Sequence, residues 1–118
     1  VSPSDVNPDA VNSYFIDLYS VEFGNGAFSQ FIYNSGGSKF ILDCVSEGLS
    51  KMGAVKNLEL FKKCRALCVD LTEVEITAFQ KGEYFGENNT REKLDIYKWD
   101  FFDIKNLVLI DLYYFVFH

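Results

Sequence analysis

The chain has 118 residues and a mass of 13.5 kDa, a size that suits a single domain over residues 1–118 with its own hydrophobic core. Eleven Lys and Arg against 17 Asp and Glu give a net charge of −6, which argues against direct nucleic-acid binding and against a basic membrane-surface helix. The single His is the last residue, so most His-dependent hydrolase and metal sites are excluded.

The first part of the chain shows apolar residues at helical spacing. They predict an amphipathic helix over 8–22, with Asn7 as its N-cap. The Gly-Asn-Gly sequence at 24–26 is expected to end this helix, because two glycines there break the helical pattern. A short aromatic helix over 27–33 follows, and the Asn-Ser-Gly-Gly sequence at 34–37 closes it as a turn.

Two further apolar stripes predict a helical hairpin. Its helices cover 38–52 and 55–68, and Gly53 stands where a helix C-cap is expected. Thr72 then fits a capping box for a helix over 73–81.

The C-terminal part starts with a polar loop over 83–89. Asn89 and Glu92 repeat the capping pattern for a helix that carries Leu94 and Tyr97. Together these elements predict an all-α fold, a compact single-domain multi-helix bundle with a central helical hairpin.

The last apolar segment is ambiguous. Residues 107–117 contain only one polar residue, Asp111, but are too few to span a membrane. Their β-branched and aromatic residues would permit a strand, yet no other segment offers a partner strand. We therefore expect a core helix over 104–117, capped by Asp103. Asp111 would lie on its apolar face and need either a polar partner or access to water.

The cysteines, Cys44, Cys64 and Cys68, are odd in number and lack the spacing of a disulfide framework or a metal site. We interpret them as buried thiols of a cytoplasmic protein. No phosphate-binding loop or nucleophile motif is present, so an enzyme is not expected, and neither is a cofactor or metal. Acidic residues from Glu92 to Asp103 could hold a divalent ion, but nothing there resembles an EF-hand loop.

Residues 25–34 read Asn-Gly-Ala-Phe-Ser-Gln-Phe-Ile-Tyr-Asn. This stretch resembles the signature N-G-G-F-x-Q-F-F-x-N of the DMP-type family of bacterial acidic DNA-mimic proteins. The matching residues are Asn25, Gly26, Phe28, Gln30, Phe31 and Asn34. Ala27 departs from the signature, which has a second Gly there. We expect a structural role for these residues: Asn25 and Asn34 would cap or bind backbone at the ends of a short helix, and Gly26 would permit a tight turn. The two Phe would lie in the core, and Gln30 is the one candidate for lining a pocket.

The resemblance implies an all-α protein that presents carboxylates as a DNA duplex presents phosphates, and so occupies a basic or DNA-binding protein. Residues 1–68 have a net charge of −1 and residues 69–118 a net charge of −5. The expected partner-binding residues are therefore Glu73, Glu75, Glu83, Glu87 and Glu92. An immunity-type protein that neutralises a basic toxin is the alternative, because acidity would also steer such a partner. The sequence leaves open whether the chain forms a homodimer.

Overall fold

The computed structural model describes residues 7–82, 88–104, 110 and 116, and every regular element among them is a helix. This confirms the predicted all-α fold. The elements in chain order are α1 (Pro8–Ser35), α2 (Lys39–Lys51), α3 (Val55–Val69), α4 (Glu73–Lys81), α5 (Asn89–Leu94) and the 3-10 helix η2 (Asp100–Asp103).

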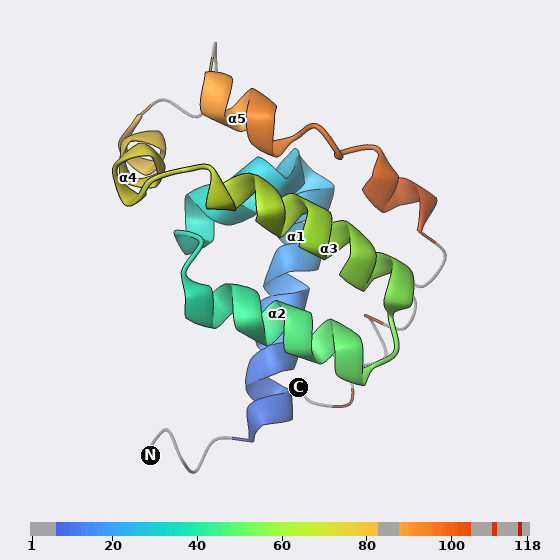
Figure 1. Cartoon of the computed structure of the whole chain (residues 1–118). Coiled ribbons are helices and arrows are strands. Elements are labelled where there is room, and N and C mark those ends of the chain that lie inside the picture. The colour runs from blue at the N-terminus through green and yellow to red at the C-terminus, as the bar shows by residue number, and fades with distance from the viewer. Residues whose placement is uncertain (1–6, 83–87, 105–109, 111–115, 117–118) are drawn as a thin grey trace.

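The predicted hairpin is formed by α2 and α3, which lie side by side across α1 (Figure 1). Gly53 joins them with φ of 75°, a left-handed conformation that glycine adopts without steric cost. The chain from α5 to η2 runs along the other side of α3 (Figure 1). The hairpin therefore packs on α1 through α2 and is flanked on its α3 side by α5 and η2.

Side-chain caps explain where most helices begin. The Asn7 side chain accepts the Asp9 amide at 2.9 Å, and Ser38 accepts the Ile41 amide at 3.2 Å. Thr72 accepts the Glu75 amide at 3.1 Å, as the capping box predicts. The prediction for α5 was wrong by one residue, because Asn88 rather than Asn89 is its N-cap and accepts the Arg91 amide.

The core is aromatic and centred on Tyr19, which is fully buried. Its ring makes edge-to-face contacts with four buried rings: Phe23, Phe31, Phe61 and Phe101. Phe101 also stacks on Phe23, with 4.6 Å between the ring centroids. Since these rings come from α1, α3 and η2, they hold the three elements together.

The interruption that the glycines at 24–26 predict is present, because Gly26 and Ala27 depart from helical φ and ψ, and the helix after this break ends at Ser35. The structure differs in that the two helices run on as one element, α1. The prediction for the last helix was wrong at its start. Asp103 does not cap a helix over 104–117, because it ends η2 and Ile104 is extended. Tyr97 lies beyond the end of α5 at Leu94.

Of the predicted last helix, Ile110 is helical and buried, while Asp111 and most of its neighbours lie outside the described residues.

Candidate partner-binding surface

The signature over residues 25–34 forms the break in α1. Gly26 and Ala27 depart from helical geometry, and Ala27 has φ of 65° and ψ of −168°. This conformation is essentially confined to glycine, so Ala27 is strained at the position where the signature has its second Gly. A Cβ on Gly26 would lie 2.1 Å from Oε1 of Gln30, so a larger residue at position 26 would clash with the Gln30 side chain as it is placed here.

Two signature residues fasten the helix across this break. The side-chain amides of Gln30 and Asn34 both donate to the same carboxylate oxygen, Oε2 of Glu22, which lies before the break. Gln30 therefore links the two halves of α1 through Glu22. Phe28 and Phe31 are fully buried, which confirms the prediction that they belong to the core.

The second half of α1 is capped from a distant part of the chain. Asp95, just after α5, accepts the Ser29 backbone amide through one oxygen and the Ser29 hydroxyl through the other, each at 2.8 Å. Burial raises the pKa of the Asp95 carboxyl, and the two hydrogen bonds from Ser29 oppose that shift. The side-chain amide of Asn34, which was expected to bind backbone, binds the Glu22 side chain, and the Ser29 amide after the break is bound by Asp95 rather than by Asn25.

The acidic residues before residue 69 mostly have partners. Lys51 pairs with Asp9 and with Glu47, each at 3.1 Å. Asp43 pairs with Lys39 at 2.6 Å and with Arg65 at 2.7 Å, and these hydrogen bonds lower the pKa of its carboxyl. These pairs neutralise much of the acidic charge on α1 and α2.

The acidic residues after residue 68 differ. Apart from Asp95, each of those that the structure describes is exposed and lies in no ion pair with another described residue. They are Asp70, Glu73, Glu75, Glu92, Asp100 and Asp103. This part of the molecule therefore presents uncompensated negative charge to solvent.

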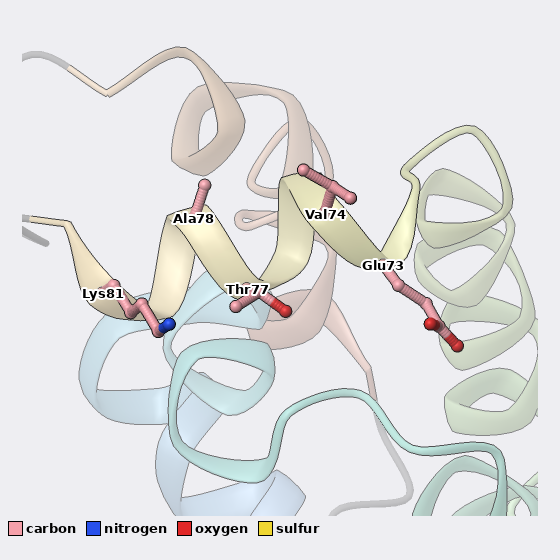
Figure 2. A pocket seen from close by; sticks show the side chains of 5 residues that line it. All are labelled: Glu73, Val74, Thr77, Ala78 and Lys81. Carbon is pink, nitrogen blue, oxygen red and sulfur yellow. The ribbon is translucent and has the colours of Figure 1, made fainter.

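Glu73 and Glu75 lie in the first turn of α4, where the positive end of the helix dipole stabilises carboxylates. Beside them is an open hollow of about 440 Å³ on the outer face of α4. Figure 2 shows Glu73 and Lys81 at its two ends, with Val74, Thr77 and Ala78 between them. Val74 is 77% exposed, so an apolar patch lies within the acidic surface.

The structure thus groups two of the five predicted partner-binding residues, Glu73 and Glu75, on one helix turn. Glu92 is exposed on the separate helix α5, and Glu83 and Glu87 lie outside the described residues. Sequence reasoning missed Asp70, Asp100 and Asp103 as members of this surface. Their charge was visible in the sequence, but only the fold shows that no described cation pairs with them.

Among the described residues, no three His, Cys, Asp or Glu side chains are grouped as metal ligands would be, and this includes the acidic residues from Glu92 to Asp103. The three cysteines are free. Burial raises the pKa of Cys64 to about 12 and that of Cys68 to about 11, so both thiols are protonated at neutral pH and are weak nucleophiles.

In the part of the chain that the structure describes, no helix has the length and apolarity to cross a membrane. Comparisons with curated proteins and with solved structures give no match. The family model of DMP19-like proteins matches residues 4–113, which includes the signature, the hairpin and the acidic helices. The chain therefore belongs to the DMP19-like protein family.

Proposed function

We propose that this chain is a non-enzymatic protein-interaction domain that acts as a DNA mimic. Its acidic surface would occupy the DNA site of a DNA-binding protein and so keep the duplex away. The observation that carries the proposal is the set of exposed, unpaired carboxylates after residue 68. A protein surface that binds duplex phosphates carries Lys and Arg, and such a surface attracts free carboxylates in the same way.

The corner between α3 and α4 is the best-formed part of this surface. Asp70, Glu73 and Glu75 lie within six residues of each other there, and Val69 and Val74 are 80% and 77% exposed beside them. Stable interfaces combine an apolar centre with a polar rim, and electrostatic complementarity sets the choice of partner. This corner supplies both kinds of contact.

The test is a displacement assay. The chain is used to capture its partner from the native host, and a captured DNA-binding protein is then bound to labelled duplex. Titration with the wild-type chain should release the duplex, and high salt should weaken this release, because the Debye length falls from about 8 Å at physiological salt to about 3 Å at 1 M. The triple variant Asp70→Asn, Glu73→Gln, Glu75→Gln should release duplex at least about ten-fold less effectively.

A matched control removes the same three charges elsewhere. The triple variant Asp9→Asn, Asp43→Asn, Glu47→Gln changes only carboxylates that already face a cation, so it should keep its ability to displace duplex. Equal loss in both variants would show a response to net charge alone and would contradict the assigned surface. Binding that leaves the duplex in place would reject mimicry and support the immunity-type alternative.

A further inference from the structure

A second hollow lies where α1 breaks, and its chemistry differs from that of the acidic surface. It has a volume of about 360 Å³. One wall is the α1 segment from Phe23 to Ala27, and the other comes from the chain between α5 and η2. Because Asp95 binds Ser29 across this junction, both walls are held in place.

Two large aromatic side chains stand exposed at this hollow. Trp99 is 69% exposed and Phe102 is 56% exposed, with their ring centroids 6.3 Å apart. Phe102 rests edge-on against the buried ring of Phe101, which in turn stacks on Phe23 in the core. The aromatic pair is therefore supported from below, and exposed, pre-positioned Trp and Phe rings are typical of the residues that dominate binding energy at interfaces.

The charges at the hollow are mainly positive. Arg91 and Lys98 are among its lining residues, and the Lys98 ammonium lies 5.1 Å from the centroid of the Trp99 ring. Asp95 is the one acidic residue among the described lining residues; its carboxylate interacts electrostatically with Lys98 and Arg91, and both of its oxygens accept hydrogen bonds from Ser29. Two cations against one carboxylate leave a net positive charge among these lining residues. Asp100 and Asp103 belong to η2 but do not line the hollow. Aromatic surface beside cations is complementary to an apolar, negatively charged ligand.

We propose that this hollow binds a peptide segment of a partner protein in which an aromatic side chain is flanked by carboxylates. The aromatic side chain would pack against Trp99 and Phe102, and the carboxylates would approach Lys98 and Arg91. The inference goes beyond the DNA-mimic function, because the acidic surface selects a basic partner and this hollow selects an acidic one. Through the two surfaces one chain could join two different proteins.

The chain reports on this site directly, because Trp99 is its only tryptophan. The probe is the peptide acetyl-Asp-Glu-Phe-Asp-Glu-amide, titrated at 0.15 M salt so that repulsion from distant carboxylates is screened. Trp99 emission should change saturably. The amide analogue acetyl-Asn-Gln-Phe-Asn-Gln-amide and the analogue with Ala in place of Phe should each bind at least about five-fold more weakly, since each lacks one of the two contacts.

Three variants locate the binding. Phe102→Ala removes an exposed ring and should weaken the probe about ten-fold, and Lys98→Gln should weaken it about two- to five-fold. Lys93→Gln removes the same charge from α5 at an exposed position outside the hollow and should change nothing. The proposal fails if the peptide leaves Trp99 emission unchanged up to millimolar concentration, if Lys93→Gln and Lys98→Gln weaken binding equally, or if Phe102→Ala has no effect. Duplex displacement by the Phe102→Ala variant should stay intact.

Discussion

In the first region, residues 7–68, acidic side chains mostly face a cation or a side-chain amide. In the second region, residues 69–104, the acidic side chains that the structure describes are mostly exposed and pair with no described cation. Asp95 is the exception in the second region, because its two oxygens accept the amide and hydroxyl of Ser29 beside the break in α1. The net charge of −6 therefore does not describe how acidic charge is distributed over the surface.

The largest expected effect comes from that exception. Asp95→Ala would leave the Ser29 amide without its acceptor and detach α5 from α1, so we expect a loss of about 2 kcal/mol in the free energy of unfolding. Urea denaturation measures it. Glu92→Ala is the control three residues away, and its exposed carboxylate should be worth less than about 0.5 kcal/mol. Similar losses of stability in the two variants would contradict the special role of Asp95 among the carboxylates after residue 68.

Glu22 gives the next largest effect, within the first region. Glu22→Ala removes the acceptor shared by Gln30 and Asn34, and we expect a loss of about 1–1.5 kcal/mol. The matched control is Glu59→Ala, an exposed glutamate of α3 that lies in no ion pair with another described residue. Thermal denaturation of both proteins should show a lower melting temperature for the Glu22 variant only.

Ala27 lies at the junction that Glu22 and Asp95 both stabilise. Ala27→Gly should raise the free energy of unfolding by about 1 kcal/mol, because glycine adopts its positive φ without strain and this gain exceeds the added chain entropy of the unfolded state. Ala66→Gly is the control, since it makes the same change at an exposed position inside the regular helix α3 and should destabilise by about 0.5–1 kcal/mol. A loss of stability in both variants would mean that the conformation of Ala27 costs nothing.

The smallest effect is a pH dependence. Burial raises the pKa of Asp95 above the ordinary value of 3.8, so ionisation costs more in the folded state than in the unfolded state. Its contribution is therefore complete below pH 3.8 and declines as the pH rises through the folded-state pKa. Hydrogen bonds from Lys39 and Arg65 lower the pKa of Asp43, so its contribution is lost as the pH falls through the lowered value.

These signs can be read from two amide variants. The stability of the wild-type chain relative to Asp95→Asn should fall as the pH rises above about 4. Its stability relative to Asp43→Asn should rise with pH only below about pH 4, between the lowered folded-state pKa and the unfolded value, and should be level above that. Equal slopes would remove the distinction between the two carboxylates.

Local pattern was enough to predict much of the fold. The core positions of Phe28 and Phe31 follow from helical spacing, and the cap at Thr72 follows from its relation to Glu75. The exposure of Glu73 follows from its place in a first helical turn. These features depend on neighbours within one or two turns of the chain.

The features that could not be predicted from the sequence depend on contacts between residues far apart in the chain. The helix after Gly26 was expected to be capped by an Asn of the signature, but the cap is Asp95, which lies 66 residues from Ser29. The same limit applies to the ion pairs. Lys39 pairs with Asp43 at a spacing that the sequence shows, but the second cation of Asp43, Arg65, comes from α3. Hydrogen-bond and ion-pair partners that come from other elements leave no local pattern.

The break at Ala27 also bears on how α1 opens. Its second half contacts α4 through the edge-to-face pair of Tyr33 and Phe79, but it also places Phe28 and Phe31 against Phe61 and Tyr19 in the core. The second half therefore cannot unfold without opening the core, whereas α4, which buries only Phe79, can open by itself. In native-state hydrogen exchange, the amides of Phe31 and Ile32 should therefore be as protected as those of Ile16 and Tyr19, and the amides of α4 should exchange faster.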